Sequence, residues 1–190
     1  MKKTNLYAIR DRALAAGRAV YSVQQLAHLI GRPKAIAKVY ASRLVRKGLA
    51  RRLLRGKIAF SEDDFVVLSQ LIEPSYVSLS SALHFHSLLT QVPRLVEGCS
   101  TRATRRYKEL GIEYHRVRPD LFFGYAHVNK GGSYAFVAEP EKALIDWVYL
   151  GAPAKSTVAE LLGHLDREKL ARYIRRVRGR GRKKLERWLL

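Results

Sequence analysis

The side chains in this sequence whose types and spacing best suit a chemical role are the cations between Arg32 and Lys57. Their ammonium and guanidinium groups can bind phosphate oxygens, and guanidinium and hydroxyl groups also hydrogen-bond to base edges. Such a cluster predicts contact with nucleic acid rather than catalysis. The residues expected to contact double-stranded DNA are Arg32, Lys34, Lys38, Ser42, Arg43, Arg46, Arg51, Arg52, Arg55 and Lys57.

Two predicted helices would position the first of these side chains. Ser22 and Gln25 have the spacing of a capping box, and apolar residues recur at helical spacing as far as Gly31. Pro33 suits the first turn of a second helix, which we expect to end near Lys47. The buried face of that helix would carry Ala37, Tyr40, Ala41 and Leu44. Its exposed face would carry small and cationic residues, as close approach to a DNA groove requires: Ala35, Lys38, Ser42 and Arg46.

A basic hairpin is expected directly after the second helix. Residues 49–54 and 57–60 flank Arg55-Gly56 and read as two short strands. With a further helix over residues 5–16, this order of elements is typical of a winged helix-turn-helix domain. The alternative is a small helical core domain whose solvated face is basic.

The charge of the whole chain points to a polyanionic partner. Its 190 residues include 36 Lys and Arg but 16 Asp and Glu, giving a formal charge of +20 and a pI near 10.5. No apolar run approaches the roughly 20 residues that span a bilayer, and the N-terminus lacks the apolar core of a signal peptide. Cys99 alone forms neither an internal disulfide nor a zinc site. We therefore expect a cytoplasmic protein without membrane association.

The fold class expected from the whole pattern is α+β. Glu73-Pro74-Ser75 interrupts the helical pattern, so we predict domains over residues 1–73 and 74–190. Strands are expected at 94–101, 112–117, 121–128 and 133–138, and a helix from Pro140 to Gly151. The second domain would hold a small, mostly antiparallel sheet and a helical, basic C-terminus.

An Arg-rich segment follows Arg172. Segments of this kind bind phosphate backbones without reading sequence, and an acidic partner protein or a solvated face are the alternatives. We expect Gly179 and Gly181 to interrupt any continuous helix there.

Neither an active site nor a bound metal or cofactor is expected. His84 and His86 are two residues apart, which places them on different faces of a helix. Glu139, Glu141 and Asp146 form an acidic cluster, but the first two suit a helix N-terminus. A nuclease using these three carboxylates is the enzymatic alternative.

The second half of the chain resembles a known family. The resemblance rests on Tyr76-Val77-Ser78 with Ser81-Ala82-Leu83, on Phe122-Phe123-Gly124, on AEPEKALID at 138–146 and on Tyr149-Leu150. This order is similar to that of the AbiEi antitoxins of type IV toxin–antitoxin systems, over roughly residues 22–151. The sequence departs from the family in lacking a glycine at 84–89 and in its Arg-rich end.

The resemblance implies a transcriptional autorepressor that binds inverted repeats in its own promoter through an N-terminal winged helix. It also implies a C-terminal domain that counters a nucleotidyltransferase-like toxin without forming a stable complex with it. A two-fold operator is read by two copies of a module, so a homodimer on the DNA is expected. The competing hypothesis is a basic protein that binds DNA or RNA non-specifically and has no antitoxin role.

Overall fold

The computed structural model describes residues 5–151 and 153–190 and divides into two units of α+β structure. Unit 1 comprises the chain up to Leu71 together with Val128–Ala135. Unit 2 comprises Ile72–His127 and Phe136–Leu190. None of the helices in the described ranges is long and apolar enough to cross a membrane.

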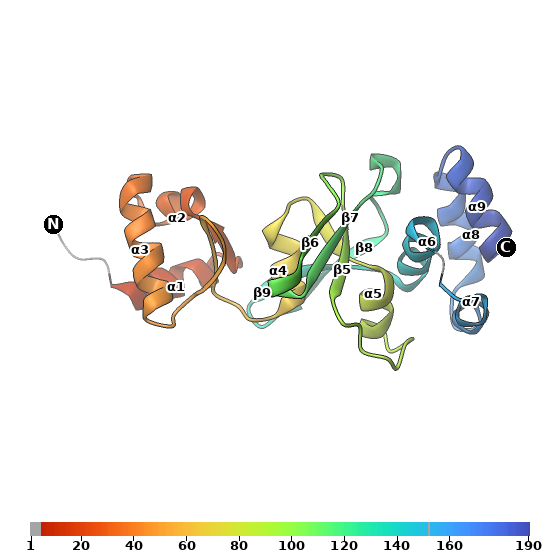
Figure 1. The fold of residues 1–190 in the computed structure, drawn as a ribbon, viewed down its shortest axis with the longest axis horizontal. Helices are drawn as coiled ribbons and strands as arrows, with labels where there is room; N and C mark the ends of the chain where they lie inside the picture. Colours follow the sequence, from red (N-terminus) through yellow and green to blue (C-terminus); the bar gives the residue numbers. More distant parts are fainter. Residues whose placement is uncertain (1–4, 152) are drawn as a thin grey trace. The chain divides into compact units, whose positions relative to one another are not determined.

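Unit 1 begins with helices and a short sheet that alternate along the chain. In order, these elements are α1 (Leu6–Ala15), β1 (Val20–Ser22), α2 (Val23–Ile30), α3 (Lys34–Arg46), β2 (Arg51–Leu54), β3 (Lys57–Ala59) and α4 (Asp64–Leu71). The strands form an antiparallel sheet in the order β1-β3-β2, in which Ile58 lies opposite both Tyr21 and Arg52. Figure 1 shows helices α1, α2 and α3 grouped together. The sequence pattern does not predict strand β1, because three residues are too few to show alternation.

The core of unit 1 lies between its helices and this sheet. It includes Ile9 and Ala13 of α1, Leu26 of α2, Leu44 of α3 and Ile58 of β3, all 9% exposed or less. The predicted capping box is confirmed, because the Ser22 side chain accepts from the Gln25 N–H while the Gln25 side chain accepts from the Ser22 N–H.

A buried glutamine attaches the segment Val128–Ala135 to the rest of unit 1. Gln70 Oε1 accepts from the N–H groups of Ala19, at 2.9 Å, and Val20, at 3.0 Å. Its Nε2 donates to Ser133 Oγ and to the Tyr134 carbonyl, at 3.0 and 2.9 Å. These four bonds satisfy the amide in a site that water does not reach, which explains why a polar residue stands on the buried side of α4.

In its described residues, unit 2 is built on a mixed sheet and five α-helices. The strands of the sheet are β4 (Ser75–Val77), β5 (Val96–Ser100), β6 (Arg105–Tyr107), β7 (Ile112–Arg116), β8 (Tyr125–Lys130) and β9 (Ser133–Ala138), and the turn between β8 and β9, with the adjoining ends of both strands, belongs to unit 1. The α-helices of unit 2 are α5 (Leu79–Phe85), α6 (Pro140–Leu150), α7 (Lys155–Leu162), α8 (Arg167–Arg176) and α9 (Arg180–Leu189). Two 3-10 turns, η1 (Lys108–Leu110) and η2 (Pro119–Leu121), connect strands.

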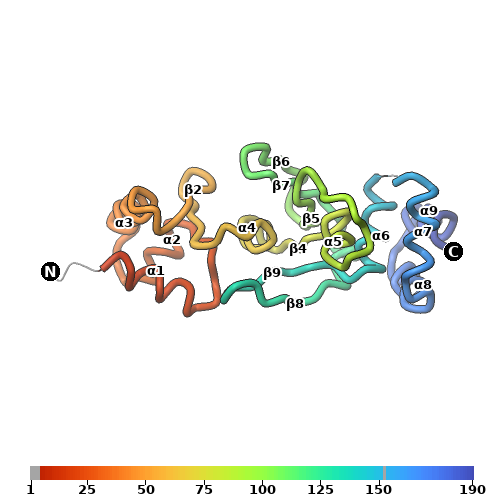
Figure 2. Tube along the Cα trace, turned by 90° about the horizontal axis from the view of Figure 1, so that it is seen from below, coloured from red at the N-terminus to blue at the C-terminus, as the bar shows by residue number. Residues whose placement is uncertain are grey.

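The prediction of a small, mostly antiparallel second sheet was wrong. The sheet has six strands in the order β6-β7-β5-β4-β9-β8, with β4 parallel to β9 and β5 parallel to β7 (Figure 2). Successive strands do lie side by side in three places, β4-β5, β6-β7 and β8-β9. The parallel pairs differ, because β9 returns to lie beside β4, about sixty positions earlier in the chain, and such long-range pairing leaves no local signal in the sequence.

The Arg-rich end of the chain forms two helices joined at Gly179, which has a φ of 70°. The predicted interruption is confirmed at Gly179, but Gly181 lies inside α9. A Cβ atom at Gly181 would come within 2.4 Å of Tyr149 Cε2 on α6. Glycine therefore serves close packing of α9 on α6 at this position rather than a break in the helix.

Candidate nucleic-acid interface

Helix α3 presents two chemically different faces. Gly31, with a φ of 61°, ends α2, and Pro33 precedes the first turn of α3. Of the predicted inner face, Ala37 and Leu44 are fully buried and Ala41 is nearly so, while Tyr40 is only partly buried against the same core. Lys34, Ala35, Lys38, Ser42, Arg43 and Arg46 are exposed.

The hairpin β2–β3 follows α3 and turns at Arg55-Gly56. Gly56 has a φ of 80°, a conformation that the tight turn requires and that side chains disfavour. Along β2 the side chains alternate, so that Leu53 is buried while Arg52 is exposed. The strand thus directs Arg52 and Leu54 to the same side, away from the core.

A groove of about 900 Å³ brings α3, the start of α2 and the hairpin together. Six of the ten residues predicted to contact DNA line it: Lys34, Lys38, Ser42, Arg52, Arg55 and Lys57. No acidic residue is among the side chains that line the groove. Its potential is therefore positive, because cations of both α3 and the hairpin line it, together with the small residues Ala35 and Ala41 of α3.

Four predicted residues lie outside this groove. Arg51 faces the opposite side of β2 and forms an ion pair with Asp64 at 3.7 Å. The Arg43 guanidinium lies 5.8 Å from the centre of the Tyr40 ring on its own helix. Arg32 and Arg46 do not line the groove either. Lys57 does line the groove, but its ammonium group donates to the Leu71 carbonyl.

The structure also adds residues that the prediction lacked. Gln24, in the first turn of α2, lines the groove, and its amide lies 3.1 Å from His28 Nε2. On α3, Ile36 and Val39 are 38% and 46% exposed, beside the cationic side chains. Apolar contact of such side chains with thymine methyl groups is a known means of reading bases. The signal for Gln24 in the sequence is the polar first turn of α2, which helix capping alone also explains.

The segment Pro140–Asp146 of unit 2, whose sequence is PEKALID, contributes to a buried polar cluster. Lys142 and Asp146 are both 0% exposed, one turn apart on α6, and form an ion pair. Asp146 Oδ2 accepts from Ser78 Oγ at 2.7 Å and from the Tyr76 hydroxyl at 3.0 Å, while Lys142 Nζ donates to that hydroxyl at 2.8 Å. Burial, and then the Asp146 carboxylate and Cys99, raise the pKa of Tyr76 well above its ordinary value, so the hydroxyl stays protonated.

The three carboxylates of the alternative nuclease site do not share one cavity. Glu139 and Glu141 bind the ammonium group of Lys169 at 3.3 and 2.9 Å. Burial raises the pKa of Glu139, but the Tyr173 hydroxyl and Lys169 outweigh it, and the pKa is lowered overall. Asp146 instead belongs to the buried cluster around Lys142. The geometry gives these acids structural partners.

The two histidines also have backbone partners. His84 Nδ1 lies 2.9 Å from the Leu89 carbonyl, and His86 Nε2 lies 2.8 Å from the Ala138 carbonyl. Within residues 5–151 and 153–190, no group of three or more His, Cys, Asp or Glu side chains is placed to hold a metal ion.

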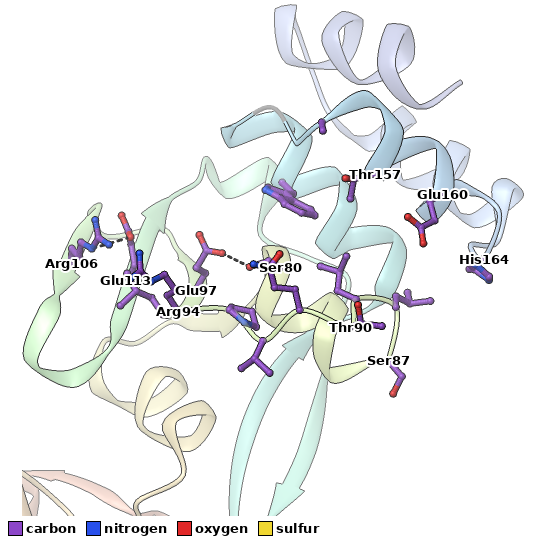
Figure 3. A pocket seen from close by; sticks show the side chains of 18 residues that line it. Ser80, Ser87, Thr90, Arg94, Glu97, Arg106, Glu113, Thr157, Glu160 and His164 are labelled. Atoms are coloured by element: carbon purple, nitrogen blue, oxygen red, sulfur yellow. Dashed lines mark hydrogen bonds and ion pairs between the residues drawn. The ribbon is translucent and has the colours of Figure 1, made fainter.

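A second hollow, of about 800 Å³, lies in unit 2 between the segment after α5 and helices α6 and α7 (Figure 3). Two pairs of its polar groups are engaged with each other. Ser80 Oγ donates to Glu97 Oε2 at 2.6 Å, and Arg106 forms an ion pair with Glu113 at 3.4 Å, as the dashed lines in Figure 3 mark. Glu97, Glu113 and Glu160 line this hollow together with Arg94 and Arg106, so it differs from the groove of unit 1, which no acidic residue lines.

Comparison of the sequence with models of protein families found no match. Comparison with curated proteins found no similar protein either.

Proposed function

We propose that unit 1 is a winged helix-turn-helix domain and that the protein is a sequence-specific DNA-binding repressor of its own promoter. The order of elements from α1 to β3 is the one such domains use, with α3 as the recognition helix and β2–β3 as the wing. The observation that carries the proposal is the groove itself. Residues separated by up to 23 positions in the sequence, from Lys34 to Lys57, line one positive, acid-free surface.

The chemistry of the groove divides into two parts. Lys38 and Ser42 lie one turn apart on α3 beside small residues, so their side chains suit contact with base edges in the major groove. Arg52 and Arg55 on the hairpin suit contact with the adjacent phosphate backbone. A repressor of this kind acts in the cytoplasm, as a homodimer on inverted repeats.

The antitoxin role rests on the resemblance of the second half to the AbiEi family. Under this proposal unit 2 counters a nucleotidyltransferase-like toxin encoded beside the gene. Co-expression with that neighbouring protein would test it, since growth should be restored by the full chain. Failure to restore growth would remove the antitoxin role and leave the repressor proposal standing.

The decisive experiment is a binding titration against the duplex upstream of the gene and a shuffled duplex of equal length, repeated across salt concentrations. A basic protein binds both duplexes at low salt, so the ratio at high salt is the informative quantity. A repressor should retain an advantage of about a thousandfold or more for the native duplex. Loss of both duplexes with the same salt slope would indicate a general polyanion binder instead.

A further inference from the structure

The Arg-rich end of unit 2 is a folded surface rather than an extended tail. Leu170 and Ile174 of α8 and Leu185 of α9 are 0% exposed, and α6 lies against both helices (Figure 1). The Arg176 guanidinium lies 4.0 Å from the centre of the Phe123 ring. The apolar sides of the two helices are therefore fixed in the core of unit 2, and their opposite sides face solvent.

Cationic side chains dominate that outer side. From Arg167 to Leu190 the sequence has eleven Lys and Arg residues and two Glu residues. Some of these cations have local partners: Lys169 binds Glu139 and Glu141, Arg182 binds Glu186 at 2.7 Å, and Lys184 donates to the carbonyls of Tyr149 and Gly151. The remainder include six exposed side chains without an ion pair or hydrogen bond to any described residue: Arg172, Arg175, Arg178, Arg180, Lys183 and Arg187.

We infer that this α8–α9 surface is a second nucleic-acid interface, which binds the sugar-phosphate backbone without reading sequence. Guanidinium groups match phosphate geometry with two parallel hydrogen bonds, and five of the six unpaired cations are arginines. The inference is independent of the repressor proposal, because it concerns other residues in the other unit.

The composition of the surface favours nucleic acid over an acidic protein. Protein interfaces are anchored by apolar or aromatic side chains near their centre. Among the described residues of α8 and α9 and the residues beside them, Leu190 is the one large apolar side chain that is exposed, and Trp188 is half-buried in a hollow that it shares with Val158 and Leu162 of α7. A surface of isolated guanidinium groups without such anchors suits a polymer of evenly spaced phosphates.

The experiment compares two variants of the full chain that lose the same charge. The test variant combines Arg172→Gln, Arg175→Gln and Arg187→Gln on α8 and α9. The control combines Arg94→Gln, Lys108→Gln and Arg116→Gln, which are also exposed and unpaired residues of unit 2. Binding of each to a shuffled DNA duplex, to an RNA duplex of equal length and to polyglutamate is measured across salt. Unchanged circular dichroism establishes that each variant is folded.

The test variant should lower the slope of log affinity against log salt by about 2 to 3 on the DNA duplex, because each lost phosphate contact removes about 0.9. Affinity at low salt should fall about tenfold or more, with a smaller loss for the control. A similar loss of salt slope on the RNA duplex would show that the site accepts the backbone of either nucleic acid. If the test variant kept the wild-type salt slope on RNA, the site would be restricted to DNA.

Equal losses in the two variants would overturn the inference, since general charge would then explain the binding. Polyglutamate bound as tightly as DNA, with the same loss in the test variant, would overturn it in favour of an acidic protein. The ratio of the affinity for the native duplex to the affinity for the shuffled duplex should be the same in the test variant as in the wild type. If that ratio is near one in the wild type, the repressor proposal is contradicted, but the α8–α9 interface is not.

Discussion

At the scale of residues, the proposed function separates the side chains of the groove in unit 1 by the part of DNA that each would reach. Lys38 and Ser42 stand on α3, where a helix in the major groove meets base edges, while Arg52 and Arg55 stand on the hairpin. Base contacts carry sequence preference, and phosphate contacts carry affinity that all sequences share. Substitutions in the α3 set should therefore change sequence preference, and substitutions in the hairpin set should change the affinity for all sequences.

Lys38→Ala and Ser42→Ala are expected to reduce the preference for the native duplex by about 1 to 3 kcal/mol each, because a base contact is lost. Arg52→Ala and Arg55→Ala should weaken native and shuffled duplexes about equally and lower the salt slope by about 1 each. Arg51→Ala serves as a control, since Arg51 is outside the groove and paired with Asp64. An equal loss on every sequence for Lys38→Ala would contradict the assignment of α3.

The buried cluster of unit 2 shows how burial changes the importance of one ion pair. Asp146→Ala would leave the Lys142 ammonium and the hydroxyls of Tyr76 and Ser78 without their shared acceptor in the core. We expect the free energy of unfolding to fall by about 3 to 5 kcal/mol. Urea unfolding measures this loss.

A matched control is present on α9. Arg182 and Glu186 have the same spacing as Lys142 and Asp146, but their side chains are 43% and 39% exposed. Glu186→Ala should therefore lower the free energy of unfolding by less than about 1 kcal/mol. Similar losses for the two variants would show that the buried cluster does not hold unit 2 together.

At the scale of elements, Glu97 connects three parts of unit 2. From β5 it accepts a hydrogen bond from Ser80 on α5 at 2.6 Å and lies 3.3 Å from His115 Nε2 on β7. Burial by itself raises the pKa of Glu97, but the bonds from His115 and Ser80 and the charges of His115 and Arg106 lower it overall. The folded protein therefore favours the ionised carboxylate.

A carboxylate whose pKa is lowered by folding stabilises the folded protein at pH values above its ordinary pKa. For Glu97 that ordinary pKa is 4.5. That contribution should be lost as the pH falls below 4.5 and through the lower pKa of the folded state. Urea unfolding between neutral pH and about pH 3 should show this loss, and Glu97→Gln should make it smaller while lowering stability at neutral pH. Glu109→Gln, at an exposed position, should leave the profile unchanged, and an unaltered profile in Glu97→Gln would contradict the role given to Glu97.

At the scale of the whole molecule, the dominant property is a net charge of +20. Charges of one sign repel each other more strongly in the compact state than in the extended chain, and dissolved salt screens this repulsion. Partner binding and stability should respond to salt in opposite directions: nucleic acid is released while the folded state gains stability.

Raising sodium chloride from about 0.02 M to about 0.5 M should accordingly raise the urea concentration at the unfolding midpoint. The variant with Arg172→Gln, Arg175→Gln and Arg187→Gln has a net charge of +17 instead of +20. Its unfolding midpoint should therefore rise less than that of the wild type over the same range of salt. A midpoint that falls as salt rises would show that attractive ion pairs outweigh the repulsion.

The sequence by itself determined the helices and the β2–β3 hairpin of unit 1 and the chemistry of its outer surface. The Ser22–Gln25 capping box, the glycine that ends α2 and the alternating faces of α3 are all local patterns, set by the period of a helix and the conformations a turn allows. Local patterns also identified Pro140 and Gly151 as the limits of α6. For that reason the amino-acid sequence alone was enough to propose ten cationic or hydroxyl side chains for DNA contact.

Only the tertiary structure decided which of those side chains converge and how the second sheet is ordered. Arg51 and Arg52 are neighbours in sequence, yet the pleat of β2 directs one to Asp64 and the other into the groove. The parallel pairing of β9 with β4, the hydrogen bonds of Lys142 and Asp146 with Tyr76, and the close approach of Gly181 to Tyr149 all join distant parts of the chain. Such contacts depend on the packing of the whole unit, which no short stretch of sequence encodes.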